Sequence, residues 1–332
     1  MHKHELMSLQ GIGPGTAAGI RSFRDWNRVD SILEKSRKSG YQLITIDDPD
    51  YSGRLKEIYD PPLLLWCRGN TKALDSDSIA VVGTRNPSHY GRQMASKITG
   101  DLIDQGLCII SGLAYGIDSI AHRTAVERSS STIAVLGSGL DRIYPTQNIP
   151  LANAIIEQGG AIITEFPPGT KPDSVNFPVR NRIVSGLALG TLIVETANEG
   201  GSMITANLAL EQNREVFAIP HVIDSGRGVG CNSLIKKGCA KLVQNIQDIM
   251  DEIPFRTPEK STPGTIVDSR DLSALNEQQK RLCSLLEKNG VLHVDQISHM
   301  IDVPVNKLLA VLLELEISGY IRSVSGKQFL LI

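Results

Sequence analysis

Four arginines follow short apolar segments of this chain, in loops that are rich in glycine and serine. Arg85 lies in GTRNPS, Arg142 in GSGLDRIYP, and Arg180 and Arg182 in FPVRNR. A guanidinium group makes forked hydrogen bonds that suit phosphate oxygens. Small residues in the same loops let backbone N–H groups face an anion, and helix N-termini add a favourable dipole. These loops therefore predict a phosphate-binding pocket.

The ligand of this pocket is not predicted to be a nucleotide cofactor. The sequence has neither GxGxxG nor GxxxxGKS/T, and Arg85 stands where a dinucleotide-binding loop would have a glycine for close approach. Arginines spread over separate loops suit the successive phosphates of a strand. Aromatic residues that could stack on bases lie in or beside the same loops. They are Tyr90, Tyr115, Tyr144, Phe166 and Phe177.

Catalytic and metal-binding groups are weakly indicated. Asp118 and His122 are four residues apart and could form an acid–base pair, but no nucleophile stands beside them. We favour a helix-capping aspartate and a packed histidine. Glu195 is compatible with a ribose contact or a structural hydrogen bond. The remaining histidines lack metal-ligand spacing, so we predict no catalytic residue, no metal and no cofactor.

The elements that must position these loops alternate between strand and helix. Short β-branched runs separated by helical stretches predict an α/β fold, an extended Rossmann-like, doubly wound and mostly parallel sheet. Ligands of such sheets bind outside the carboxyl ends of the strands, where the unusual residues occur. The predicted strands are Ile79–Val82, Cys108–Ile110, Thr132–Leu136, Ala161–Ile163, Thr191–Val194 and Val216–Ile219.

Four parts are predicted along the chain. Residues 1–70 form a helical N-terminal domain, in which Gly11–Gly15 resembles the turn of a helix–hairpin–helix (SAM-like) domain or of a plain helical hairpin. Residues 71–253 form the Rossmann-like core, and 254–271 a linker rich in proline, serine and threonine. Residues 272–332 have the order of a winged helix. Its third helix carries Lys307 against Glu314 and Glu316, which predicts a partner-binding or spacer role and little DNA reading.

Composition is that of an ordinary globular protein. The 332 residues carry a formal net charge of −2, so a polyanion site must come from local placement of arginines. No apolar run is long enough for a membrane helix, and the N-terminus lacks the apolar core of a signal peptide. Five cysteines without a CxxC pair suit reduced thiols. We expect a cytoplasmic protein with no membrane partner.

The loops together resemble those of the DNA-processing protein A (DprA/Smf) family. The matching motifs run in the family's order from about Ile79 to Val243. They are GTRNPSHYG, SGLAYGIDSIAH, TIAVLGSGLDRIYP, ITEFPPG, FPVRNRIVSG, LIVETANEGGSMITANLALEQNREVFAIP and GVGCNSLIKKG. His221 and Cys239 depart from the family pattern, which usually has glycine and alanine there.

The resemblance implies a non-enzymatic protein that binds and protects incoming single-stranded DNA and loads the RecA recombinase onto it in natural transformation. It also implies a homodimer through the core. Several of the predicted pocket residues follow from the family's motifs, and the others come from the glycine-rich and arginine-containing loops described above. The predicted DNA-binding residues are Gly83, Thr84, Arg85, Ser88, Ser111, Gly112, Gly137, Arg142, Arg180, Asn181, Arg182, Gly201 and Ser202.

Two other functions stay open at this point. The run NEGGSMITA loosely resembles the PGGxGTxxE loop of nucleoside-monophosphate-processing enzymes that hydrolyse the N-glycosidic bond, although the final acid is missing. Alternatively, the chain is an interaction module whose pocket senses a small nucleotide.

Overall fold

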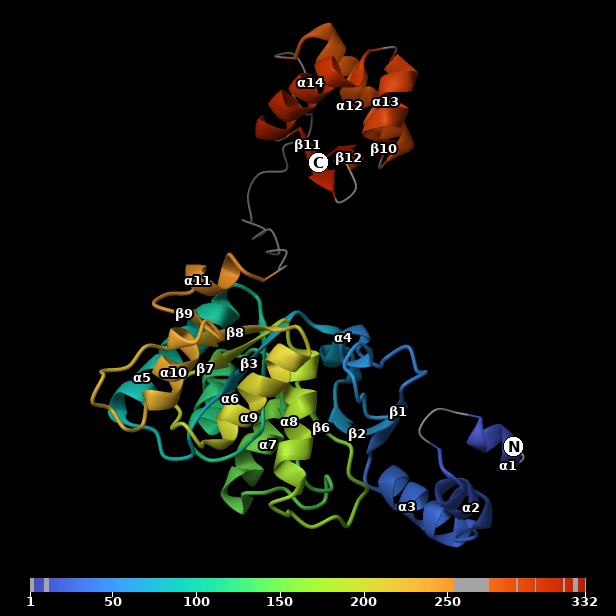
Figure 1. Cartoon of the computed structure of the whole chain (residues 1–332), viewed down its shortest axis with the longest axis vertical. Coiled ribbons are helices and arrows are strands. Elements are labelled where there is room, and N and C mark those ends of the chain that lie inside the picture. The colour runs from blue at the N-terminus through green and yellow to red at the C-terminus, as the bar shows by residue number, and fades with distance from the viewer. Residues whose placement is uncertain are drawn as a thin grey trace. The chain divides into compact units, whose positions relative to one another are not determined.

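The computed structural model describes residues 3–8, 12–253, 275–290, 292–301, 303–318, 320–324 and 328–331. The chain separates into two units, Met1–Lys260 and Ser261–Ile332, and each is described by itself (Figure 1). The predicted linker, residues 254–271, lies outside the described residues, as do Gly11 and the loop 325–327.

A nine-stranded sheet organises the first unit, in the order β1-β2-β6-β5-β4-β3-β7-β8-β9. Strands β3 to β9 pair in parallel, with Ala80 of β3 opposite Ile110 of β4 on one side and Thr191 of β7 on the other. The predicted doubly wound α/β fold is therefore confirmed. The strands are Gln42–Thr45, Leu64–Gly69, Ser78–Val82, Cys108–Ser111, Thr132–Val135, Ala161–Thr164, Gly190–Ile193, Glu215–Ala218 and Lys241–Leu242.

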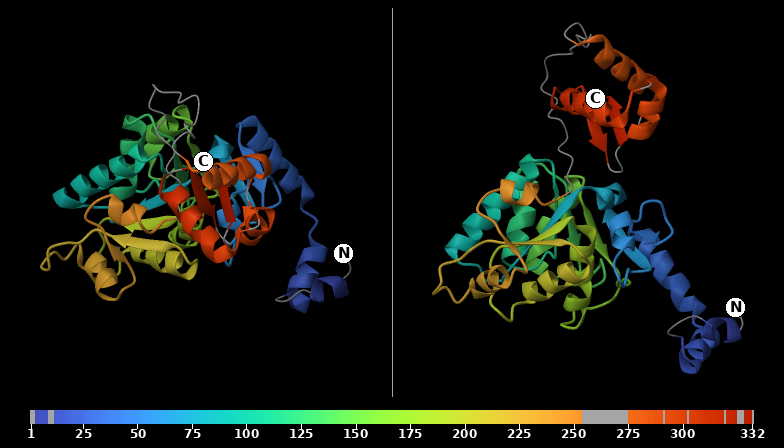
Figure 2. Two further views of the ribbon diagram at one scale, coloured as in Figure 1. Left: turned by 90° about the horizontal axis from the view of Figure 1, so that it is seen from above. Right: turned by 45° about the horizontal axis from the view of Figure 1, so that its top comes forward.

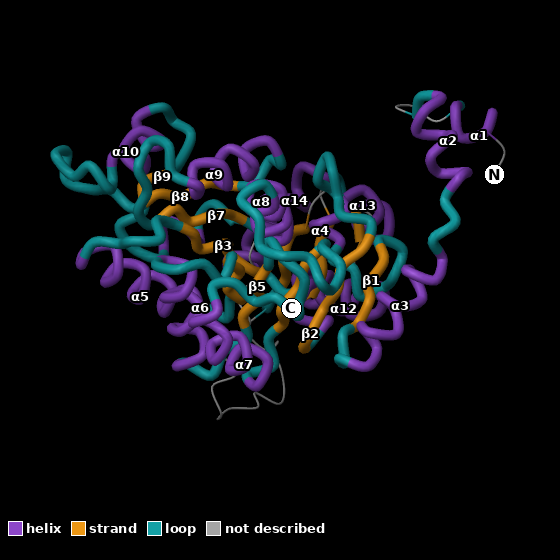
Figure 3. Tube along the Cα trace, turned by 90° about the horizontal axis from the view of Figure 1, so that it is seen from below, coloured by secondary structure: helices purple, strands orange, loops and turns teal. Residues whose placement is uncertain are grey.

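Helices cover both faces of this sheet, because residues alternate along each buried strand. One face packs against α5 (His89–Asp104), α6 (Ile117–Glu127) and α7 (Ile149–Glu157). The opposite face packs against α8 (Asn176–Leu187), α9 (Gly201–Glu211) and α10 (Val229–Lys236). Figure 3 shows the two groups of helices on either side of the orange strands. The teal-to-green helices and the yellow-to-orange helices of the left view in Figure 2 belong to the same two layers.

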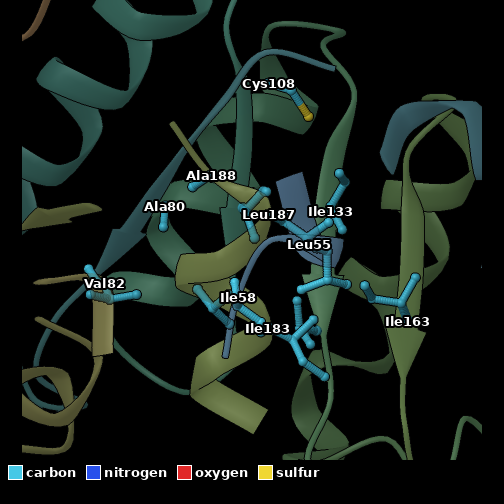
Figure 4. Close-up of a cluster of buried hydrophobic side chains, with 14 of the residues drawn as sticks. Leu55, Ile58, Ala80, Val82, Cys108, Ile133, Ile163, Ile183, Leu187 and Ala188 are labelled. Carbon is cyan, nitrogen blue, oxygen red and sulfur yellow. The ribbon is translucent and has the colours of Figure 1, made fainter. Parts of the chain in front are cut away.

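A short helix, α4 (Gly53–Lys56), adds to the core on the second face. Its Leu55 is fully buried, and Ile58 follows it into the same cluster with Ile183 and Leu187 of α8 (Figure 4). Gly186 allows this contact, since a Cβ there would lie 2.9 Å from Ile58. The α4 segment thus fixes α8, whose first turns carry Arg180 and Arg182.

The predicted boundary at residue 70 grouped residues 42–69 with the N-terminal helices. In the structure these residues belong to the core sheet. Strand β2 pairs antiparallel with β6, and β1 pairs with β2, so both strands extend the core sheet. Trp66 and Leu65 are buried in that sheet. The sequence has no marked break between these short strands and the helices that precede them, so the boundary was placed after the strands. The N-terminal helices are α1 (Lys3–Met7), α2 (Pro14–Ser22) and α3 (Trp26–Lys38).

The second unit has the predicted winged-helix order. Helices α12 (Glu277–Asn289), α13 (Val294–Ile301) and α14 (Val305–Ile317) pack around one apolar cluster that includes Leu282, Ile297 and Leu312. A three-stranded sheet completes it, in the order β10-β12-β11. The strands are Leu292–His293, Ile321–Val324 and Gln328–Leu331, and the last two match the predicted runs.

Candidate nucleic-acid interface

A cleft of about 750 Å³ opens at the carboxyl ends of β3, β4 and β7. Strand β3 lies between β4 and β7, so the chain leaves it in opposite directions at this point of the sheet. Such a switch point separates the two loops that follow the strands, and it is where doubly wound folds bind their ligands. Five segments line the cleft: residues 82–85, 112–118, Tyr144, 172–184 and 196–205.

The exposed cation of the cleft is Arg85. Its guanidinium carbon lies 5.5 Å from the centroid of the Phe177 ring, which is within the range of a cation–π contact. The Phe177 ring in turn lies 5.9 Å from that of Tyr144, which is 43% exposed. Arginine and two aromatic rings thus form one wall, suited to a phosphate next to a base.

The floor of the cleft contains Arg180, which is only 4% exposed. Its guanidinium donates to the carbonyl oxygens of Gly112, at 2.7 Å, and of Val135. Gly112 makes room for it, because a Cβ there would lie 2.5 Å from the guanidinium nitrogens. Burial lowers the pKa of Arg180 to about 10, with Asp118 opposing that shift, so the group remains a cation at neutral pH. Arg180 ties β4 to β5 and gives the floor a positive charge.

Asp118 supports the loop after β4 and does not cap its helix. The N-cap of α6 is Gly116, and the Asp118 carboxylate accepts from the N–H groups of Gly112, at 3.1 Å, and Ala114, at 3.4 Å. The capping prediction was therefore wrong, because the side chain folds back toward the strand. Burial raises the pKa of Asp118, while Arg180 opposes this shift.

His122 is a packed histidine, as we favoured. Its Nδ1 lies 2.8 Å from Oγ1 of Thr132, and the residue is fully buried. Burial lowers its pKa to about 3, so the imidazole is neutral. This neutral ring is bonded to a threonine and does not lie among the residues that line the cleft.

The buried carboxylate of Glu195 accepts hydrogen bonds at the N-terminus of α5. The side chain is fully buried, and its Oε2 accepts from N of Ser88 at 3.0 Å and from Oγ of Ser88 at 2.9 Å. Gly91 leaves space for the carboxylate, since a Cβ there would lie 1.8 Å from Oε2. In a dinucleotide-binding fold this helix end holds the pyrophosphate. Here an internal carboxylate fills it, which explains how the fold dispenses with the glycine fingerprint.

The free helix end at the cleft belongs to α9. Its N-cap is Gly200, which has no side chain to cap the first N–H groups. Gly201 and Ser202, in the first turn, line the cleft. The first N–H groups of a helix have no partner within it and carry the positive end of the dipole. On this wall the Ser202 hydroxyl donates to Oγ1 of Thr196 at 2.7 Å. The α9 terminus therefore faces the cleft with donors suited to an anion.

The structure brings eight of the thirteen predicted residues together around the cleft and places five elsewhere. Ser88 caps α5 and bonds Glu195, and the buried Ser111 donates to the Val81 carbonyl. Arg182 pairs with Glu165 at 2.7 Å and with Asp60 at 3.3 Å. The eight that line the cleft are Gly83, Thr84, Arg85, Gly112, Arg180, Asn181, Gly201 and Ser202.

The other two residues outside the lining are Gly137 and Arg142. A Cβ on Gly137 would lie 2.9 Å from the Phe177 ring, so this glycine seats the aromatic wall. Arg142 is exposed on the following loop. Their contact with DNA stays a prediction.

Thr196, Ile204 and Thr205 are among the cleft residues that were not predicted from the sequence. The sequence did hold a sign of Thr205, because Ser202, which was predicted, lies three residues before it on the same face of α9.

His221, a departure from the family pattern, is also accommodated in the structure. Its Nε2 lies 2.9 Å from the carbonyl oxygen of Val194, and Gly228 leaves space for the ring.

The described ranges, residues 3–8, 12–253 and the parts of 275–331 given above, contain neither a membrane-spanning helix nor a metal-binding cluster. No helix there is both long and apolar enough to span a bilayer. No group of three or more histidine, cysteine or acidic side chains there is arranged to hold a metal ion.

The fold and cleft define a class of protein: a Rossmann-like, doubly wound core with a positively charged cleft at the switch point, joined to a winged helix. Residues 42–254 match the family described as DNA recombination-mediator protein A, and residues 268–327 match the DprA winged helix domain. The chain belongs to this DprA/Smf family.

Named relatives match most of the chain. Protein Smf of Escherichia coli is 38% identical over 90% of this chain and 79% of its own length. The DNA processing protein DprA of Bacillus subtilis is 38% identical over 71% of this chain and 79% of its own. The crystal structure of DprA from Streptococcus pneumoniae matches with a TM-score of 0.68 and 36% identity, over 77% of this chain and 88% of that one. DprA from Helicobacter pylori, whose structure is described as showing a single-stranded DNA binding mode, matches with a TM-score of 0.57 and 33% identity over 63% and 94%.

Proposed function

We propose that this protein binds single-stranded DNA in the cleft and processes it during natural transformation. The observation that carries the proposal is that the exposed Arg85, over the Phe177 ring, lines the same cleft as the N-terminus of α9. A cation, a stacking ring and helix amides recognise a phosphate and a base without reading sequence. The single-stranded DNA binding named for the Helicobacter pylori relative supports the same ligand.

The finer parts of the proposal follow from the resemblance to the family. The bound strand is protected and passed to the RecA recombinase, and the protein acts as a homodimer through its core in the cytoplasm. On this proposal the protein is not an enzyme. Two observations support that part: His122 is bonded to Thr132, and Glu195 is bonded to Ser88, so neither side chain faces the cleft.

Binding of a labelled single-stranded oligonucleotide across a salt series tests the proposal. We expect tight binding that duplex of the same sequence competes for poorly. Arg85→Ala should weaken binding of all sequences alike, by roughly 1 to 3 kcal/mol, and flatten the salt slope by about 0.7. Arg123→Ala is the matched control, because Arg123 is exposed on α6 and does not line the cleft.

Three outcomes would count against the proposal. Equal effects of the Arg85 and Arg123 substitutions would place the strand outside the cleft. Release of free base from nucleoside monophosphates would favour the glycosidic hydrolase. Saturable binding of a mononucleotide that oligonucleotide does not displace would favour a nucleotide sensor.

A further inference from the structure

A second surface rich in aromatic and basic side chains lies at the turn between α2 and α3. Phe23 and Trp26 contact each other edge to face, with ring centroids 5.1 Å apart. Trp26 is 61% exposed and Phe23 is 42% exposed, and neither lines the cleft. Large aromatic side chains are usually well buried, so an exposed pair of this kind indicates a surface that binds something.

Basic residues lie close to the two rings along the chain. Arg21, Arg24 and Arg28 are exposed in the segment 18–28, in which Asp25 is the one acidic residue. Arg24 is fixed in place, because its Nη1 donates to the carbonyl oxygens of Arg21 at 2.7 Å and Phe23 at 2.8 Å. Arg24 is therefore held at this turn next to Phe23, and the excess of arginine over acidic residues in the segment favours an anionic partner.

We propose that this turn is a second contact for single-stranded nucleic acid, in which Trp26 and Phe23 stack on bases and Arg21 and Arg28 bind phosphates. The inference rests on the proposed function, since it extends the same ligand beyond the cleft. It is separate from the glycine-rich turn at Gly13, which lies at the other end of α2, about 13 Å away along a nine-residue helix. A polyanion accounts for the arginines as well as the rings, whereas an apolar protein partner accounts for the rings alone.

The two contacts together require a longer strand than the cleft alone. A single OB fold, a common single-strand-binding module, holds about 4 to 16 nucleotides, which sets the scale for one contact. We therefore expect the turn to matter for oligonucleotides of roughly 40 nucleotides and to matter little for those of about 10. This length dependence separates the second contact from the cleft.

Trp26 reports on its own surface. The chain has two tryptophans, and the other, Trp66, is 6% exposed and donates to Oγ of Ser36 at 3.2 Å. Quenching of the exposed indole by a long thymidine oligonucleotide therefore measures stacking at the turn. We expect quenching in the unmodified full-length protein and also in Arg85→Ala. The Trp26→Phe variant should keep its affinity and lose the signal.

Affinity measurements with matched controls complete the test. Trp26→Ala should weaken binding of the long oligonucleotide by about fivefold or more and change binding of the short one by less than about twofold. Tyr59→Ala is the aromatic control, because Tyr59 is 101% exposed and lies elsewhere. Arg28→Ala should weaken long-strand binding more than Arg37→Ala, its exposed counterpart on α3.

Each alternative outcome has a definite meaning. An unchanged Trp26 signal, with oligonucleotide bound and Arg85→Ala weakened, overturns the second contact and leaves the proposed function standing. A signal that depends on protein concentration without oligonucleotide shows that the surface joins two copies of the chain, and it overturns the inference. No binding of any oligonucleotide by the unmodified protein at low salt removes both proposals.

Discussion

At the scale of single residues, the cleft depends on buried charges whose position the sequence did not reveal. Arg85, Thr84 and Gly83 were predicted as DNA-binding residues from their place after a strand; all three line the cleft, and their contact with DNA stays a prediction. Arg180 and Arg182 are two residues apart in the same motif, yet one lies in the cleft floor and the other pairs with Glu165. Their environments differ because α8 turns one side chain toward Gly112 and the other toward β6. Spacing alone could not separate them.

Replacing Glu195 with glutamine should destabilise the core. The carboxylate accepts from both N and Oγ of Ser88, and an amide in its place brings a donor to a helix N-terminus. We expect a loss of about 1 to 3 kcal/mol in the free energy of unfolding, measured by urea denaturation. Glu211→Gln, an exposed position on α9, is the control. Equal stability of the two variants would contradict the assigned role of Glu195.

Removal of the Glu195 carboxylate should create a site that binds a small anion. Glu195→Ala leaves a polar space at the N-terminus of a 16-residue helix, where the N–H and hydroxyl of Ser88 donate to the carboxylate and Gly91 leaves room for it. That space suits a small anion. We expect inorganic phosphate to raise the melting temperature of this variant and to leave that of the unmodified protein unchanged. An absence of phosphate stabilisation in a folded variant would show that the space collapses.

Buried His122 makes stability depend on pH. Its pKa is about 3 in the folded protein against 6.5 for an exposed histidine, so the unfolded chain binds more protons below neutral pH. The folded state therefore loses stability as pH falls from about 6.5 toward 3. The contribution from this residue between pH 7 and pH 5 is about 2 kcal/mol. His122→Gln should remove that part of the pH dependence in urea titrations, whereas His89→Gln, at an exposed position, should retain it.

At the scale of elements, the sequence was informative where strands are buried on both faces. Runs such as Ile79–Val82 were recognised because parallel strands between two helical layers are apolar throughout. The strands β1 and β2 were assigned to the wrong side of a boundary, because β2 joins the core sheet through a non-local antiparallel pairing with β6, and β1 joins it only through β2. No local pattern encodes that pairing. The winged helix was predicted more completely, since each of its elements follows its neighbour closely in the chain.

The stability of the winged-helix unit should depend on the N-terminal cap of α12. Asn276 accepts from N of Gln279 at 2.9 Å, and the Gln279 side chain returns the bond to N of Asn276 at 3.0 Å, which forms a capping box on α12. Asn276→Ala should cost about 1 kcal/mol in that unit. Hydrogen exchange should then accelerate in residues 275–331 and stay unchanged in the core sheet. Acceleration in both units would show that they unfold together.

At the scale of the whole molecule, the two units differ in the surfaces they offer to DNA. The exposed part of α14 carries Leu309 and Leu313 with Lys307 and Glu314, which is poor in the basic and amide side chains that contact nucleic acid. The core has the cleft, with Arg85 and the α9 terminus. We therefore expect a fragment of residues 1–253 to bind single strands within about twofold of the full chain and with the same salt slope, because it keeps the cations that contact phosphates.

The reverse fragment sharpens this prediction. Residues 272–332, if folded by circular dichroism, should bind single strands and duplex weakly and alike, since few phosphates are neutralised on that surface. Competition between the two fragments for one labelled oligonucleotide then measures the share of each unit directly. Binding of the 1–253 fragment that falls tenfold or more below that of the full chain would mean that the winged helix contributes strand contacts. The apolar residues of α14 would in that case flank a DNA surface rather than a partner-binding one.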